Sequence, residues 1–406
     1  MTLRPRDKSD QRGSARRSRA AGAVCVLLTE VSDRGGIEVY AKAFLVSLAR
    51  AYRGKQLSVI LHRNRTPPSV ELPSDANIRF FCCGHSCRVL QILRFVRHLY
   101  GLLLRRPVIV LSNHVDLLKP CWFTCRAVGV PYGVIVYGID AWNPKAAVRA
   151  ILRGATAIAS ISRYTSERLA DAVTKLPSTC LLPPPATEAR MGCVLSEGEL
   201  RERLRAEDGP VILTVCRLSK TERRKGYDTV LEAMPDILEK IPSATYVLVG
   251  EGDDVPRIRK RIEALGLRNH VRMPGYVPNE QLGSYYSIAD VFVMPSSKEG
   301  FGIVFLEALM QGVPVIGGNV DGTRDALMNG QLGLMVTPGQ PVEVTQAILN
   351  VIHGQLPDHL ASPATVRERA VEAFGEQAFL ANTARFLGLL GSMSGDLTAC
   401  DVGGRS

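Results

Sequence analysis

The sequence contains few aromatic residues and no long apolar run. Of its 406 residues 6% are aromatic, and only two are tryptophan. The longest apolar runs, 20–28 and 128–139, fall short of the ~18 residues that span a bilayer, which argues against a transmembrane helix. No dense run of lysine and arginine with interleaved aromatics indicates a nucleic-acid surface. No short-period repeat is present either.

The charge is positive and unevenly distributed. Fifty lysines and arginines against 39 aspartates and glutamates give +11, which favours anionic substrates or partners. Seven basic side chains and two carboxylates in residues 1–20 account for +5 of this. The apolar run that follows resembles an export signal, but Thr29-Glu30 ends it and no small-x-small cleavage site follows. We therefore expect a disordered basic tail at 1–22.

Ten cysteines are scattered along the chain, and a chain of this length can bury a core without disulfides. We expect reduced thiols and a cytoplasmic location. The segment Cys82–Cys87 matches no usual zinc spacing, and Asp253-Asp254 are adjacent loop residues, a poor geometry for joint coordination. No Asp-x-Asp pair ends a strand, so no metal site is expected.

The apolar pattern alternates short β-branched runs with helical periodicity in both halves of the chain. Such alternation is typical of parallel sheets covered on both faces, so we expect an α/β protein with two Rossmann-like doubly wound domains. The predicted strands are Val24–Leu28, Leu57–His62, Val108–Ser112, Gly133–Tyr137, Ala157–Ser160, Val211–Val215, Thr245–Val249, Val271–Met273, Val291–Met294 and Val313–Gly317. The intervening segments are mostly helical, and Val366–Leu390 is expected to form one helix.

The composition, 46% hydrophobic and 22% charged, suits a globular protein, and ~150 residues per domain gives two or three domains. We expect an amino-terminal domain and a carboxyl-terminal domain, with a final helix that packs back toward the first. The predicted limits are 1–22 tail, 23–186 first domain, 187–209 linker, 210–365 second domain, 366–390 helix and 391–406 disordered tail.

Residues 295–308 carry the clearest functional signal. A buried strand ends at Met294, and a glycine-containing turn leads into a helix that begins near Ile303. Gly300 and Gly302 allow a ligand to approach the backbone, and free N–H groups at a helix start bind phosphate oxygens. Glu299 lies at the carboxyl end of the strand, where doubly wound sheets bind ligands, and Glu307 lies one turn into the helix.

These two glutamates and their glycines resemble the signature of family 4 retaining glycosyltransferases, the GT-B enzymes of glycosyl transferases group 1. The likeness extends from Ala23 to about Leu390. Further matching motifs are Gly35-Gly36, Val215–Leu218, Lys225-Gly226, Val249–Gly252, Gly275–Val277, Ala289–Phe292 and Gly317–Leu327.

The resemblance implies two domains that face each other across a cleft, an acceptor-side amino-terminal domain and a carboxyl-terminal domain that holds the nucleotide-diphosphate sugar. The resemblance also implies that this sugar is the co-substrate, with no other cofactor and metal-independent transfer. It implies a donor-binding set and places Glu299 near the donor sugar. The donor-binding residues are Gly35, Gly36, Arg217, Lys225, Val277, Gly300, Phe301, Gly302, Ile303 and Glu307. Arg217 and Lys225 would hold the diphosphate, and Glu307 the ribose. Because Arg217 ends a buried strand, we also expect it to be partly buried and to need an anion.

One position departs from the family pattern. Many relatives carry a histidine that contacts the donor sugar at the strand end where this chain has Tyr137. Asp140 follows three residues later, and His114 ends the preceding strand. We include all three with Glu299 as candidate catalytic residues. For each of His114 and Tyr137, ordinary packing is an equal alternative.

The predicted helix 88–106 has two alternative environments. Ile92, Leu93, Val96, Leu99, Tyr100, Leu103 and Leu104 form a broad apolar face, and Arg94, Arg97, His98 and Arg105 form a basic face. Such a helix can lie on an anionic membrane, or it can pack on its own sheet with solvated arginines. The basic tail and the net charge favour the membrane.

Together with this resemblance, the sequence predicts a hexosyltransferase in polysaccharide or glycolipid biosynthesis, in the cytoplasm or on the inner face of the membrane. The resemblance implies retention of anomeric configuration and, by itself, favours mannose or glucose. The donor would be a UDP- or GDP-sugar, and the acceptor a saccharide or a lipid-linked molecule. Two alternatives remain at this point. They are a nucleotide-sugar epimerase of the same build and a non-catalytic nucleotide- or saccharide-binding protein.

Overall fold

The structure is a computed structural model that describes residues 24–32, 35–53, 55–105, 107, 109–120, 122–186, 194–206 and 209–391. The side chains of Ile139 and Asp140 are not among the features described. The tail predicted at 1–22 lies outside the described residues, as do 187–193 of the predicted linker and nearly all of the tail predicted at 391–406.

The first half of the chain forms a seven-stranded parallel sheet in the order β3-β2-β1-β4-β5-β6-β7. Its strands are β1 Val24–Leu28, β2 Gln56–Leu61, β3 Asn77–Cys82, β4 Ile109–Ser112, β5 Tyr132–Val136, β6 Ala157–Ser160 and β7 Ser178–Leu181. The helices are α2 Gly36–Ala51, α3 Arg88–Leu103, η1 Val115–Leu118, α4 Trp122–Ala127, α5 Ile139–Trp142, α6 Ala146–Gly154 and α7 Arg163–Ala172.

The second half forms a six-stranded parallel sheet in the order β10-β9-β8-β11-β12-β13. Its strands are β8 Val211–Val215, β9 Thr245–Val249, β10 Val271–Gly275, β11 Val291–Met294, β12 Val315–Gly318 and β13 Leu334–Val336. The helices are α8 Glu197–Leu204, η3 Lys220–Lys225, α9 Tyr227–Lys240, α10 Val255–Ala264, α11 Asn279–Ser287, α12 Ile303–Met310, α13 Thr323–Ala326, η4 Met328–Gly330, α14 Pro341–Ile352, η5 Asp358–Leu360, α15 Pro363–Phe374 and α16 Glu376–Leu389.

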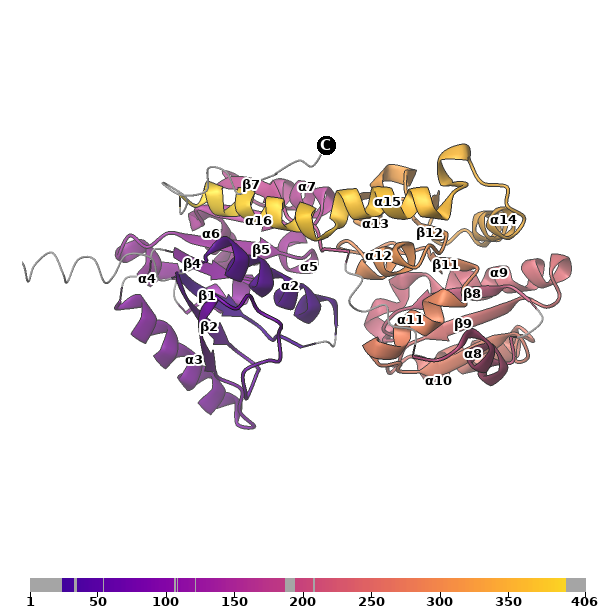
Figure 1. The fold of residues 1–406 in the computed structure, drawn as a ribbon, viewed down its shortest axis with the longest axis horizontal. Coiled ribbons are helices and arrows are strands. Elements are labelled where there is room, and N and C mark those ends of the chain that lie inside the picture. Colours follow the sequence, from indigo (N-terminus) through magenta and orange to yellow (C-terminus); the bar gives the residue numbers. More distant parts are fainter. Residues whose placement is uncertain are drawn as a thin grey trace, which may run out of the picture.

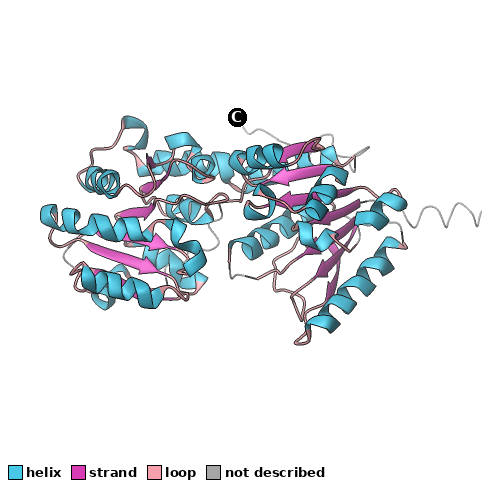
Figure 2. Cartoon of the chain, turned by 180° about the vertical axis from the view of Figure 1, so that it is seen from behind, coloured by secondary structure: helices cyan, strands magenta, loops and turns pink. Residues whose placement is uncertain are grey.

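Both sheets have helices on their two faces, as Figures 1 and 2 show from opposite sides. The central strands β1, β5, β8 and β9 are buried along their whole length, which explains their continuous apolar sequences. This confirms the predicted fold class of two doubly wound α/β domains. Among the described residues, no helix is both long enough and apolar enough to cross a bilayer.

The structure corrects two predicted elements. The stretch predicted as a linker contains α8, which begins with a capping box in which the side chains of Ser196 and Glu199 each accept a hydrogen bond from the other residue's backbone N–H. The single helix predicted at 366–390 is two helices, α15 and α16, which separate at Gly375. A β-carbon on Gly375 would lie 2.3 Å from the Val371 carbonyl oxygen, so this break requires glycine.

The last helix, α16, packs on the first sheet although it follows the second in sequence. It contacts α2, β6 and β7, and Figure 1 shows α15 and α16 running in succession above the two halves. Gly133 on β5 leaves room for this helix, since a β-carbon there would lie 2.9 Å from the Phe386 ring. The exact domain limits given above stay a prediction.

The two halves contact each other near the carboxyl ends of their strands. A β-carbon on Gly300, in the loop after β11, would lie 2.2 Å from the carbonyl oxygen of Tyr137, which follows β5. The Tyr164 backbone N–H of α7 donates to Asp325 Oδ2 of α13 at 3.1 Å. These contacts bring the carboxyl ends of the two sheets together, and the candidate site lies there.

Candidate donor-binding site

The loop after β11 is held from beneath by Asp321. This fully buried carboxylate accepts hydrogen bonds from the Glu299 N–H at 2.6 Å, the Ser296 hydroxyl at 3.2 Å and the Thr323 N–H at 2.9 Å. Burial raises the pKa of Asp321 to about 6, although the hydrogen bonds from Thr323 and Glu299 favour its ionised form. Asp321 therefore fixes the backbone that carries Glu299.

The loop passes into α12 through Gly302, whose φ of +94° belongs to the left-handed region. A β-carbon at this position would lie 2.5 Å from the Phe305 ring. The first N–H groups of α12 have no hydrogen-bond partners within the helix. The start of this helix lies next to the Gly35–Gly36 loop of the first half. There Gly35 has a φ of +86°, and a β-carbon on Gly36 would lie 3.5 Å from Ile303 Cδ1.

Lys225 and Glu299 form a mostly buried ion pair, with exposed side-chain fractions of 20% and 15%. Burial alone would lower the pKa of Lys225, but the charge and hydrogen bond of Glu299 outweigh burial, and the pKa is raised. Lys225 is therefore a cation near neutral pH. Its ammonium has three N–H donors, so a phosphate oxygen can bind beside Glu299.

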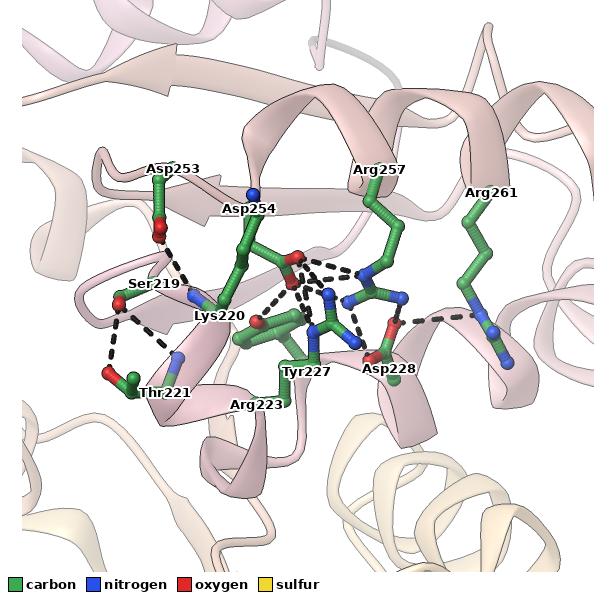
Figure 3. Close-up of polar contacts among 10 residues, drawn as sticks. All are labelled: Ser219, Lys220, Thr221, Arg223, Tyr227, Asp228, Asp253, Asp254, Arg257 and Arg261. Atoms are coloured by element: carbon green, nitrogen blue, oxygen red, sulfur yellow. Dashed lines mark hydrogen bonds and ion pairs between the residues drawn. The ribbon is translucent and has the colours of Figure 1, made fainter.

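A network of ion pairs fixes the η3 segment that ends at Lys225 (Figure 3). The carboxylate of Asp254 is fully buried and accepts hydrogen bonds from Arg223, Arg257 and the Tyr227 hydroxyl. The hydrogen bonds from Arg257, then those from Arg223 and Tyr227, hold the pKa of Asp254 well below its usual range despite burial. Asp253 accepts from the Lys220 N–H at 2.9 Å. These two aspartates thus anchor the basic segment.

The position of Arg217 corrects one prediction. Its side chain is 68% exposed, and its Nη1 lies 3.6 Å from Glu222 Oε1. Because Arg217 follows β8 instead of ending it, the side chain leaves the buried layer, and the expectation of a partly buried arginine was wrong. An exposed arginine with one loose partner can turn toward a ligand, so its role in donor binding stays a prediction.

Of the remaining donor-site candidates in the second half, Glu307 has a side chain available to a ligand, and Phe301 does not. Glu307 lies on α12, and its Oε2 accepts a hydrogen bond of 2.8 Å from the Tyr286 hydroxyl of α11, which orients the carboxylate. Val277, after β10, is buried. Phe301 is buried and packs edge-on against Phe374, with ring centroids 5.4 Å apart. The Phe301 side chain therefore belongs to the core, and only its backbone is available to a donor.

The first-half candidates differ in how they are placed. The Tyr137 ring packs edge-on against Tyr40 at 5.2 Å, and its backbone touches Gly300. His114 caps η1, and its Nδ1 accepts from the Asp116 N–H at 3.2 Å, which leaves Nε2 for a ligand. Asp140 begins α5 just after Tyr137, and its side chain lies outside the described features.

Three contributors to the site were not singled out from the sequence. Asp321, Tyr286 and Asp254 position Glu299, Glu307 and the Lys225 segment. Asp321 was visible only as part of a motif, and no local signal marks a buried tyrosine as the partner of a distant glutamate. Within the part of the chain that the structure describes, no cluster of three histidine, cysteine or carboxylate side chains could hold a metal ion.

Solved structures share this architecture over most of the chain. A sucrose-phosphate synthase from Thermosynechococcus elongatus superposes with a TM-score of 0.72 at 22% identity, over 92% of this chain and all of that one. HepE of Anabaena in complex with UDP gives 0.69 at 18% identity, over 90% and 99% of the two chains. At such identities the likeness establishes the fold, which is that of GT-B glycosyltransferases.

Sequence comparison adds a match to a family model. Residues 196–370, less than half of the chain, match the model described as glycosyl transferases group 1, which is the group that the motifs of this segment resemble. A GDP-mannose-dependent alpha-(1-6)-phosphatidylinositol monomannoside mannosyltransferase of Mycobacterium tuberculosis is 34% identical over 52% of this chain and 57% of its own length. The same-named protein of Mycolicibacterium smegmatis is 28% identical over 78% of this chain and 85% of that one. The chain thus spans little more than half of the first relative.

Proposed function

We propose that this protein transfers a hexose, mannose or glucose, from a UDP- or GDP-sugar to a saccharide or lipid-linked acceptor with retention of anomeric configuration. The observation that carries the proposal is the Lys225–Glu299 pair just before α12, whose first residue, Ile303, lies beside Gly36 of the first half. The relatives support it, because their names include GDP-mannose-dependent mannosyltransferases and an alpha-D-kanosaminyltransferase of Streptomyces kanamyceticus.

The diphosphate of the donor would lie against the first N–H groups of α12, with Lys225 and Arg217 on its anionic oxygens. Negative charge grows on the diphosphate as its bond to the sugar breaks. A fixed cation and a helix start oriented toward that charge stabilise it more in the transition state than in the ground state. This electrostatic role requires no metal ion, so we propose metal-independent transfer.

The nucleoside would extend from the diphosphate toward α11. Glu307, oriented by Tyr286, would accept hydrogen bonds from the ribose hydroxyls, and the base would lie near Val277. The donor sugar would lie between Glu299 and the first-half residues Tyr137, Asp140 and His114. Tyr137 can donate a hydrogen bond but carries no positive charge near neutral pH.

In the proposed step the acceptor oxygen attacks the anomeric carbon on the face from which the phosphate oxygen departs. The bond from carbon to phosphate oxygen breaks, the bond to the acceptor oxygen forms, and the acceptor proton passes to the departing phosphate oxygen. No side chain then has to act as a strong base. We place the reaction in polysaccharide or glycolipid biosynthesis, at the cytoplasmic side of a membrane.

The test is incubation of the purified protein with GDP-mannose or UDP-glucose and a membrane extract, followed by mass spectrometry and anomeric analysis of the product. We expect an acceptor-dependent hexose adduct with the donor's anomeric configuration, unchanged by a chelator and lost in Glu307→Ala. Interconversion of the donor sugar without acceptor would instead identify an epimerase. A nucleotide-induced rise in melting temperature with no transfer to any acceptor would identify a binding protein.

A further inference from the structure

Helix α3 exposes an unusual amount of apolar surface. Val89, Leu93 and Leu104 are 64%, 58% and 84% exposed, and Leu90, Ile92 and Tyr100 are exposed as well. The side chains that pack on the sheet are instead Phe95, Leu99, Leu102 and Leu103. The face of α3 that packs on the sheet therefore carries only some of its apolar side chains. Packing within the chain does not explain why the others are apolar.

The exposed apolar surface continues onto α4. The Tyr100 hydroxyl donates to the Pro120 carbonyl at 2.9 Å and lies 3.2 Å from Thr124 Oγ1, which brings α4 beside the second half of α3. Phe123 on α4 is 72% exposed. We call Val89, Leu90, Ile92, Leu93, Tyr100, Leu104 and Phe123 the α3–α4 apolar strip. Helices α3 and α4, which carry this strip, lie on the side of the first half that faces away from the second sheet (Figure 1).

The charges around this strip are almost all positive. Between Asn77 and Ile139 the sequence has eight basic side chains and one carboxylate, Asp116. Asp116 pairs with Lys119 at 2.6 Å and, among the described residues, not with an arginine. The pKa of His98 on α3 is lowered by burial and by the neighbouring arginines Arg97, Arg79 and Arg94. On α3 itself, Arg94 and Arg97 are exposed beside the apolar strip.

We propose that the α3–α4 apolar strip is a docking surface for an anionic lipid bilayer. The apolar side chains would enter the boundary between headgroups and acyl chains, and the arginines would bind lipid phosphates. A carboxylate-free helix with adjacent apolar and cationic strips complements that boundary. The inference rests on the proposed function for its lipid-linked acceptor, but the binding itself needs neither donor nor transfer.

The experiment is co-sedimentation of the full chain with phosphatidylcholine vesicles, with and without phosphatidylglycerol. We expect binding only to the anionic vesicles and a steep loss of binding with added salt. Leu93→Ser with Leu104→Ser should lower the partition coefficient at least ~10-fold, because two exposed leucines no longer enter the bilayer. Arg94→Gln with Arg97→Gln should lower it about 10-fold at low salt.

The matched control is Val342→Ser, which removes a 74% exposed valine from α14, in the second half. It should bind vesicles as the unaltered chain does, and thermal unfolding should show that all variants remain folded. Unaltered binding in the double-leucine variant, or no binding of the parent chain to anionic vesicles, would overturn the proposal. So would a parent dimer that the double-leucine variant converts to monomer, because the strip would then serve self-association.

Discussion

Lys225 and Glu299 lie 74 positions apart in the chain, and the second sheet brings them into a single ion pair. Removing the lysine leaves a mostly buried carboxylate without its cation and takes a positive charge away from the proposed diphosphate site. We expect Lys225→Ala to lower kcat/KM for transfer at least ~10²-fold. The control is Lys220→Ala, which removes an exposed lysine of the same segment. Its kcat/KM, measured by steady-state kinetics, should stay within ~3-fold of that of the unaltered chain. Near-parental turnover in Lys225→Ala would refute the assignment.

The Tyr286–Glu307 hydrogen bond allows a graded test of ribose binding. Glu307→Ala should lower kcat/KM at least ~10²-fold, because it removes the proposed acceptor of the ribose hydroxyls. Tyr286→Phe removes only the hydroxyl that orients Glu307, so donor affinity should fall about 5-fold, which corresponds to the ~1 kcal/mol of an average hydrogen bond. Tyr285→Phe, one position earlier on α11, is the control for isothermal titration with nucleoside diphosphates. Equal effects of both phenylalanine variants would contradict an orienting role for Tyr286.

Asp321 predicts a pH dependence of stability. Because its pKa is raised from 3.8 to about 6 in the folded state, its contribution to stability is fully present below 3.8 and is lost as the pH rises through about 6. Relative to Asp321→Asn, the parent chain should gain about 1 kcal/mol of unfolding free energy between pH 7 and pH 5. Urea unfolding of both proteins at each pH measures this difference. A difference independent of pH would show that Asp321 is ionised throughout.

Among the elements, the start of α12 depends most on one backbone conformation. Gly302→Ala must adopt a left-handed φ and also push its methyl against the Phe305 ring, so the first turn of the helix should shift. We expect a lower melting temperature and at least ~10-fold weaker donor binding. Gly339→Ala has a similar φ of +77° but faces open space, so it should cost only about 1 kcal/mol and leave binding unchanged. Scanning calorimetry and isothermal titration with UDP and GDP measure the melting temperature and the nucleotide binding of both variants.

Most of the strands that the sequence predicted are buried and apolar along their length. The strands that were not predicted, β3, β7 and β13, lie at the edges of their sheets and are only partly buried. Polar residues interrupt β3 and β7, and β13 is only three residues long. Helix α8 has only Leu200 and Leu204 buried, and its charged remainder conceals the helix, although its capping box was a readable signal. The break at Gly375 depends on a contact with a carbonyl that periodicity cannot reveal.

The sequence motifs predicted which residues form the candidate site, but not which of its charged side chains form ion pairs with each other. Gly300, Gly302 and Glu299 follow from one contiguous segment, so their proximity could be read directly. The pairing of Lys225 with Glu299 and the exposure of Arg217 depend on how strands far apart in the sequence end at one sheet edge. A linear pattern gives the residue types there, but not which charges meet.

At the scale of the whole molecule, the two halves approach each other closely at Gly300. In Gly300→Ala the new methyl would lie 2.2 Å from the Tyr137 carbonyl oxygen, so the halves must separate locally. We expect a larger radius of gyration in small-angle scattering and weaker donor binding. Gly101→Ala, whose β-carbon would meet nothing within 4 Å, is the control and should change neither. An unchanged radius of gyration in both variants would show that the loop absorbs the methyl without moving the halves.

The return of α16 to the first sheet also bears on biosynthesis. While the nascent chain leaves the ribosome, the face of β5 and β6 that will receive Phe386, Leu387 and Leu390 stays uncovered until almost the last described residues are made. A product shortened before Glu376 would present that bare apolar face to chaperones and proteases. Cellular quality control can therefore distinguish a finished polypeptide from a truncated one by a single terminal helix.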